Sequence, residues 1–273
     1  NAASIALTAG DTVTLAAVNA DNFTSKTTTN VDSITVATGV AVIVNAAQSN
    51  LVNTTGGGTY SVTDSLAGII TEAAGGSAGL NGAAQINVTF DSGTEVAVLT
   101  GLGDAAAPTA IDFADDAVTI SLVEFNALIA AGIALTAGDT VTLAALDGDD
   151  LSGLTLTNVD GVSAAGGVDV VLSIAQHTTP GVSGDGTYSI TDSLTDIIAE
   201  FAGGSSILNG ASQINVTFDS GTEVAALTGL GDAAAPTAID FGDDAVTITL
   251  VELDALNAAS IALTAGDTVT LAA

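Results

Sequence analysis

The residues of this sequence that are best suited to chemistry are the acidic residues in its turns, because of their type and spacing. Aspartates stand beside glycine in the segments GLGD and DFADD, and a denser group stands in LDGDDLSG. Calcium takes six to eight oxygen ligands from carboxylates and backbone carbonyls, often on loops rich in Gly and Asp. We therefore expect calcium to be bound by members of one set of aspartates. The set is Asp104, Asp112, Asp115, Asp116, Asp147, Asp149, Asp150, Asp232, Asp240, Asp243 and Asp244.

A second interpretation of these aspartates stays open, in which they cap helices and build turns without any metal. Neither the EF-hand spacing nor a glycine-rich nonapeptide run occurs in the chain. Catalysis is not expected, and no catalytic residue is assigned. The obvious carboxylate pair, Asp115 with Asp116, returns as Asp243 with Asp244, and a single histidine cannot serve several sites. We expect a protein that is not an enzyme.

The balance of charges restricts the partners of the chain. One Lys and no Arg stand against 31 Asp and Glu, which gives a formal net charge of −30. Phosphate backbones are bound by clustered Lys and Arg, so nucleic acid is excluded as a partner. The most apolar run, residues 36–47, is too short to insert into a membrane, which takes about 20 residues. The lone cations, Lys26 and His177, are predicted to be exposed loop residues.

A fixed internal repeat decides how the chain is organised. The segment ASIALTAGDTVTLAA at residues 3–17 returns almost unchanged at 131–145 and unchanged at 259–273, an offset of 128 residues each time (131 − 3 and 259 − 131). We divide the chain into a first copy at 1–130, a second at 131–258 and the start of a third at 259–273. We expect it to be a window from a longer array.

The two copies differ unevenly along their length. Residues 18–56 and 146–184 differ at most positions, whereas 58–128 and 186–256 are nearly the same sequence. A variable stretch of constant length is typical of surface residues on a fixed frame.

Smaller units are visible within one copy. Short strand-like triplets begin at Ile5, Ile34, Tyr60, Ile86 and Ile111, and most precede an Asp, Gly or Ser turn. Helical spacing follows at 66–75, with Ser65 as N-cap and Gly75 as stop, and again at 122–132. The same spacing of Val96, Leu99 and Leu102 predicts a third helix, whereas 13–15 and 118–122 alternate like strands.

These units of about 25 residues are too small to enclose a core alone and must stack. We therefore expect a β-rich repeat protein, a parallel β-solenoid with short helical segments and about five coils in each 128-residue copy. The alternative is a string of tandem β-sandwich domains, one for each copy.

The segments YSVTDSLAGIITEAAG (60–75) and YSITDSLTDIIAEFAG (188–203), with the GDTVTLAA runs, resemble units of very large bacterial secreted repeat proteins. That class comprises surface adhesins, biofilm-matrix proteins and S-layer-like proteins, many with acidic calcium-binding repeats. The resemblance implies an extracellular location at a bacterial surface and calcium as a bound ion.

Together these observations predict a structural extracellular protein. We expect tandem copies to associate with identical copies into a fibre, sheath or surface layer that divalent cations stiffen. The alternative is an adhesin stalk or ligand-binding array whose variable stretches contact a cell surface or glycan.

Overall fold

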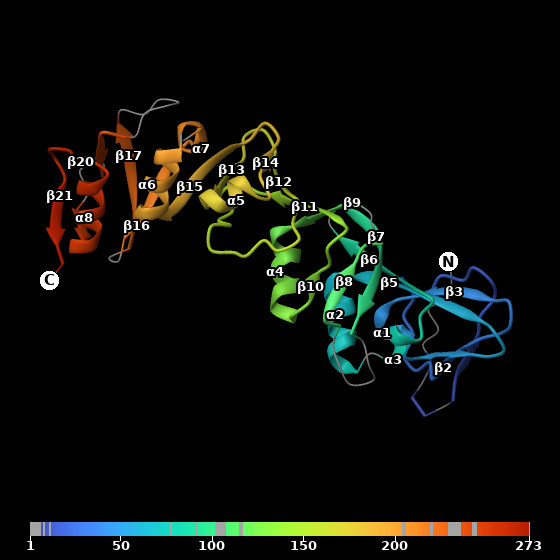
Figure 1. The fold of residues 1–273 in the computed structure, drawn as a ribbon. Coiled ribbons are helices and arrows are strands. Elements are labelled where there is room, and N and C mark those ends of the chain that lie inside the picture. The colour runs from blue at the N-terminus through green and yellow to red at the C-terminus, as the bar shows by residue number, and fades with distance from the viewer. Residues whose placement is uncertain are drawn as a thin grey trace. The chain divides into compact units, whose positions relative to one another are not determined.

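The fold was analysed in a computed structural model of the 273-residue chain (Figure 1). The structure describes residues 7, 9–10, 12–76, 78–90, 92–101, 108–114, 117–203, 206–218, 221–228, 236–241 and 245–272. The chain divides into two compact units, Asn1–Thr142 and Leu143–Ala273. The predicted boundaries of the repeat copies lie about one strand earlier in the sequence than this division and remain a prediction.

The first unit combines short strands with four helices among its described residues. In chain order its elements are β1 (Thr14–Ala16), β2 (Ser33–Val36), β3 (Ala41–Val44), α1 (Ala46–Ser49), β4 (Val52–Thr54), β5 (Thr59–Ser65), α2 (Leu66–Gly75), α3 (Ala78–Asn81), β6 (Gln85–Phe90), β7 (Gly93–Thr100), β8 (Ala110–Asp112), β9 (Ala117–Ser121), α4 (Leu122–Ala131) and β10 (Ala134–Leu135). β11 (Thr140–Ala145) runs across the division between the units.

The second unit repeats this order 128 residues later. Its elements are β12 (Gly161–Ala164), β13 (Asp169–Leu172), α5 (Ile174–Thr178), β14 (Val182–Ser183), β15 (Thr187–Ser193), α6 (Leu194–Gly203), α7 (Ser206–Gly210), β16 (Ile214–Phe218), β17 (Gly221–Thr228), β18 (Ala238–Asp240), β19 (Ala245–Ile248), α8 (Leu250–Ala258), β20 (Ala262–Leu263) and β21 (Thr268–Leu271). Each helix and strand thus has a counterpart at the repeat offset, within a residue or two at most ends.

The largest sheet of each unit has six strands and mixes parallel with antiparallel neighbours. In the first unit the order is β10-β8-β7-β6-β5-β3, and in the second it is β13-β15-β16-β17-β18-β20. β3, β5 and β6 are parallel, then β7 runs antiparallel to both β6 and β8. A smaller parallel sheet in the first unit has the order β1-β2-β4, and β19 pairs with β21 in the second.

The predicted fold class is wrong. Within the described residues the strands form five sheets with parallel and antiparallel pairs, and none is closed or solenoid-like, so the protein is a mixed α/β fold. The reversal at β7 is incompatible with a parallel solenoid, in which every strand enters its coil in the same direction. The helices that connect β5 to β6 also distinguish the fold from tandem β-sandwiches, which consist of antiparallel sheets alone.

The error at β7 has a local cause. Val96 and Leu99 stand at helical spacing, yet the segment GTEVAVLT also alternates, and the structure extends it as an eight-residue strand. It directly follows β6 across a tight connection in which Phe90 pairs with Gly93 at φ 149°. Pairing with β6 on one side and β8 on the other satisfies the backbone of β7, which outweighs the weak helical pattern.

Helices α2 and α4 form where the sequence predicts them, whereas α1 and α5, which also begin with capping boxes, were not predicted. Ser65 accepts a hydrogen bond from the Gly68 N–H (3.1 Å) at the start of α2, and Gly76 at φ 126° follows its end. At α4, Ser121 and Glu124 form a reciprocal capping box, and Gly132 adopts the left-handed conformation after the last turn. None of the helices in the described ranges is long and apolar enough to cross a membrane.

Each unit packs its own apolar core between the sheet and the helices. Phe90 and Phe113 meet edge to face with ring centroids 5.4 Å apart, and Phe218 repeats this contact with Phe241. Phe113 and Phe241 are fully buried. Because the same aromatic pair anchors both cores, the framework that carries the variable segments is the same in each unit.

Candidate functional site

The acidic segment LDGDD lies in a turn at the start of the second unit's variable stretch. Asp147 Oδ1 accepts the N–H of Asp169 (3.0 Å), and Asp149 Oδ2 accepts the N–H of Leu146 (2.8 Å). Asp150 Oδ1 accepts both the N–H and the hydroxyl of Ser152 (2.9 and 2.6 Å). Each of the three carboxylates thus holds a backbone amide of its own turn or of the adjacent strand.

The first unit builds the same turn with less charge. Asn19 and Asn22 occupy the positions of Asp147 and Asp150. Asn19 Oδ1 accepts the Ala41 N–H (3.0 Å), and Asn22 Oδ1 accepts both the N–H and the hydroxyl of Thr24 (3.0 and 2.8 Å). The neutral amides of the first unit make the same hydrogen bonds as the carboxylates of the second. The turn therefore requires a side-chain oxygen atom at these positions but does not require a negative charge.

The remaining predicted calcium ligands fall into two groups. Asp112 Oδ1 accepts the N–H of Ala114 (2.7 Å), and Asp240 lies at the end of β18. Asp104, Asp115, Asp116, Asp232, Asp243 and Asp244 lie outside the described residues. In the described parts of the chain, no three acidic or histidine side chains are grouped so that they could hold a metal ion. Calcium binding therefore stays a prediction.

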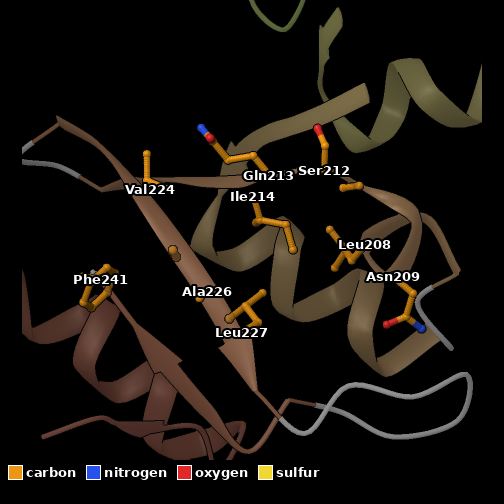
Figure 2. Close-up of a pocket in the computed structure, with 11 residues that line it drawn as sticks. Leu208, Asn209, Ser212, Gln213, Ile214, Val224, Ala226, Leu227 and Phe241 are labelled. Atoms are coloured by element: carbon orange, nitrogen blue, oxygen red, sulfur yellow. The ribbon is translucent and has the colours of Figure 1, made fainter. Parts of the chain in front are cut away.

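A concave groove opens in the second unit between α7 and the β16–β17 hairpin. Figure 2 shows Leu208 on α7, Ile214 on β16 and Leu227 on β17 around it. Its volume is about 660 Å³, and Asn209, Ser212 and Gln213 supply polar groups at its margin. Apolar and polar side chains both line this open groove.

The first unit carries the same groove at the corresponding positions. Leu80, Ile86 and Leu99 line it, and its volume is about 530 Å³. Val98 in the first unit corresponds to Ala226 in the second, and the smaller side chain accords with the larger volume there. Because the groove recurs at the repeat offset, it belongs to the part of the structure that the two units share.

A carboxylate surrounded by hydroxyl groups stands beside the groove of the second unit. Asp169 accepts hydrogen bonds from Thr187 (2.6 Å), Ser212 (2.7 Å) and Ser189 (2.7 Å). The Ser189 and Ser212 hydroxyls are also 3.0 Å apart. Burial alone raises the pKa of Asp169, but the three hydroxyl donors together outweigh it and lower the pKa below its ordinary value.

This cluster is specific to the second unit. In the first unit Ala41 stands in place of Asp169 and Ala84 in place of Ser212, whereas Thr59 and Ser61 match Thr187 and Ser189. The carboxylate and its third donor therefore occur together in one copy and are absent together from the other. Comparing the two copies position by position could have identified the pair, which the prediction of acidic turns missed.

Three further acidic side chains line a second hollow in this unit, of about 390 Å³. They are Asp192, Asp196 and Glu200, placed on the end of β15 and on α6. Burial, and next the negative charge of Asp196, raise the pKa of Asp192, although hydrogen bonds from the Ser193 and Ile174 N–H groups oppose the rise. Position 68, the counterpart of Asp196, is glycine.

His177 is not the exposed loop residue that the sequence predicted. It lies in α5, is half-buried, and packs its ring against Tyr188 with centroids 4.3 Å apart. Burial lowers the pKa of His177, and the charge of Glu200 partly counteracts this. The ring is therefore a packing element of the second unit. Lys26, by contrast, is exposed and lies between elements, as predicted.

Comparison of the chain with protein-family models, curated proteins and solved structures finds no match.

Proposed function

We propose that the protein is a structural component of a bacterial surface, in which tandem copies associate into a fibre, sheath or layer outside the cell. The observation that carries the proposal is the return of every helix and strand of the first unit 128 residues later in the second. Repetition of a whole framework supplies many identical contact surfaces, which an extended assembly needs and a single reaction does not.

The uneven variation between copies supports the same proposal. The aromatic pairs, the capped helices and the β6–β7 hairpin are preserved between the units, whereas residues 18–56 and 146–184 differ. A constant frame serves contacts between copies. The variable stretches contribute buried strand residues such as Val36, Val44 and Leu172, so only their exposed residues serve an outer surface. No enzymatic reaction is part of this proposal.

Divalent cations enter the proposal as counter-charges. A net charge of −30 on each 273-residue chain opposes close association of copies, because like charges repel. Calcium bound by carboxylates would reduce that repulsion and stiffen the assembly.

Sedimentation velocity of the full chain tests the proposal. We expect species larger than the monomer that grow with protein concentration, and more of them with calcium than with a chelator. A single monomeric boundary at every concentration, with and without calcium, would refute the structural role.

An adhesin stalk or ligand-binding array is the second candidate function. The observation that favours it is the groove present in each unit, together with the Asp169 cluster that distinguishes one unit from the other. A glycan array probed with the full chain tests this candidate. Saturable binding that a groove variant such as Leu227→Arg abolishes would support it, provided that Val251→Arg, at an exposed site on α8, leaves binding unchanged.

A further inference from the structure

The groove of the second unit opens where two neighbouring strands of the large sheet separate. The antiparallel strands β16 and β17 pair from Phe218 with Gly221 as far as Ile214 with Ala225. Beyond that pair β17 continues to Thr228 beside β18, whereas β16 has no further residue in the ladder. The groove is therefore a gap in the sheet, of a kind that another stretch of extended backbone would fill.

The gap arises because the chain bends away just before β16. Counting along the ladder, Ser212 would stand opposite Leu227. Instead, the Ser212 N–H donates to the Tyr188 carbonyl (2.8 Å), and its hydroxyl donates to the same oxygen (3.0 Å), which holds Ser212 toward β15. In the first unit the Ala84 N–H makes the same bond to the Tyr60 carbonyl (2.8 Å). Both units therefore contain the gap.

Main-chain groups of Leu227 point into the gap. Successive residues of a strand direct their N–H and C=O groups to opposite sides. The Thr228 carbonyl accepts the Thr237 N–H (2.9 Å) on the β18 side, so the groups of Leu227 face the other side. Among the described residues, none on that side is hydrogen-bonded to Leu227. The gap thus offers one main-chain donor and one acceptor next to each other.

The side chains around the gap lie on two different sides of the sheet. Figure 2 shows Leu208, Ile214 and Leu227 on one side, and Ser212, Gln213 and Val224 on the other. The carboxylate of Asp169 lies behind Ser212, 2.7 Å from its hydroxyl. One side of the gap is therefore apolar, and the other is polar with a carboxylate near it.

We propose that the gap of the second unit binds an extended peptide segment of a partner protein, which adds a strand antiparallel to β17 and alternates apolar with basic side chains. The inference rests on the second candidate function, the ligand-binding array, and names its ligand. The residue opposite Leu227 is apolar and contacts Leu208 and Ile214, and the basic residues beside it face Asp169.

The main-chain geometry favours a peptide over a sugar. A residue of an extended strand carries its own N–H and C=O on the same edge, so it pairs with both groups of Leu227. A single trans amide, such as the N-acetyl group of an amino sugar, has its N–H and C=O pointing in opposite directions and bonds to only one of them.

The charges around the gap favour a basic peptide. The net charge of −30 attracts cationic partners and repels anionic ones. Asp240, opposite Ala226 in the register of β18, lies on the same side of the sheet as the Asp169 cluster. The first unit retains Asp112 in place of Asp240 but has Ala41 in place of Asp169. We therefore expect the second gap to bind a basic peptide more tightly than the first.

Fluorescence anisotropy with a fluorescein-labelled, alternating Lys-Val peptide and the full chain tests the strand pairing. We expect saturable binding, and none of an alternating Glu-Val peptide. N-methyl groups on the Val residues remove the donors that pair with Leu227 and should weaken binding by about tenfold. N-methyl groups on the Lys residues leave those donors in place and should change binding little. Equal binding of all three Lys-Val peptides would mean attraction by charge alone and would overturn the proposal.

Variants measure each gap separately. Leu99→Arg blocks the gap of the first unit, and in that background Asp169→Ala should weaken peptide binding about threefold to fivefold. Asp185→Ala removes an exposed carboxylate from the same unit and should leave binding unchanged.

The reciprocal variant does not depend on the stability of the second unit. Leu227→Arg blocks the second gap, and Ala41→Asp/Ala84→Ser then installs the carboxylate and its third donor beside the first, where Thr59 and Ser61 already match Thr187 and Ser189. The first gap should gain the affinity that Asp169→Ala removes from the second. Unchanged binding in both backgrounds would overturn the role of the carboxylate.

The outcomes separate this inference from the functions on which it builds. Saturable glycan binding without peptide binding would overturn the peptide ligand and leave the ligand-binding array standing. Binding of neither would overturn both of these, whereas the structural role is decided independently by sedimentation of the chain without peptide.

Discussion

Removing the carboxylate of Asp169 should destabilise the second unit and leave the first unaffected. Asp169→Ala installs the residue that the first unit has at position 41. The change deletes the acceptor of three hydroxyl donors, on Thr187, Ser189 and Ser212. It tests whether the cluster beside the groove is a stabilising network.

The magnitude follows from the exposure of the donors. Ser189 is 4% exposed, so its hydrogen bond to a carboxylate contributes about 1 kcal/mol or slightly more. Thr187 and Ser212 are exposed, and solvent reduces their contributions to about 0.5 kcal/mol each. Ser189 retains Ser212 as a partner at 3.0 Å. The sum is a loss of about 2 kcal/mol, equivalent to about 8 °C in Tm for a unit of this size.

Tyrosine fluorescence during urea unfolding can report on the second unit alone. In a Tyr60→Phe background the remaining tyrosine is Tyr188, which neighbours the cluster in β15. The control is Asp185→Ala, which removes an exposed carboxylate from the same unit and should change stability by less than about 0.5 kcal/mol.

The double variant Asp169→Ala/Ser212→Ala reproduces both residues of the first unit. It should be more stable than the sum of the single changes implies, by about 1 kcal/mol, because the two groups interact. Additive losses would contradict a coupled network. An Asp169→Ala variant that is more stable than the wild type would contradict the reasoning altogether, because relief of net charge would then outweigh the hydrogen bonds.

Three further predictions address packing, pH and metal. Gly79→Ala places a Cβ 2.8 Å from the backbone carbon of Ser49, so we expect a loss of about 1–3 kcal/mol of unfolding free energy, and an unchanged urea midpoint would refute the close contact. The pKa of Asp192 is raised, so the folded unit binds that proton more tightly than the unfolded chain, and this group's contribution to stability rises as pH falls through the folded pKa. Asp196→Gly should lower that pKa in a carboxyl NMR titration, and an unshifted titration would contradict the assigned cause. If calcium neutralises the acidic surface, a chelator should lower Tm, whereas identical melting curves would leave the aspartates as turn residues alone.

Helices α2 and α4 were predictable because short-range hydrogen bonds specify them, whereas the shorter helices α1, α3, α5 and α7 were not predicted. Ser65 and Ser121 are strong N-caps, and the structure begins α2 and α4 directly after them. The strands at Ile34, Tyr60 and Ile86 were likewise predicted from their alternation. In each case the deciding residues lie within a few positions of the element.

The sheet topology was not predictable in the same way. Regular spacing of triplets does not record the direction of a strand, and β7 runs antiparallel to its neighbours because the backbone reverses at Gly93. A single reversed strand in each copy excludes the solenoid, although most of the individual strands were correctly placed.

The polar clusters depend on contacts that are distant in sequence. Ser212 donates to Asp169 across 43 residues, and His177 meets Tyr188 because α5 packs beside β15. Neither contact can be recognised from the residues that are close to it in the sequence. The sequence gives one indication of the contact between Asp169 and Ser212. Both residues are replaced by alanine, Ala41 and Ala84, in the first copy.

Electron microscopy of the full chain at high concentration tests whether copies of this protein associate into an extended structure. We expect filaments or layers built from repeated, similarly shaped units. Fields of separate, uniform particles of one chain each, in the presence of calcium and at every concentration, would contradict it.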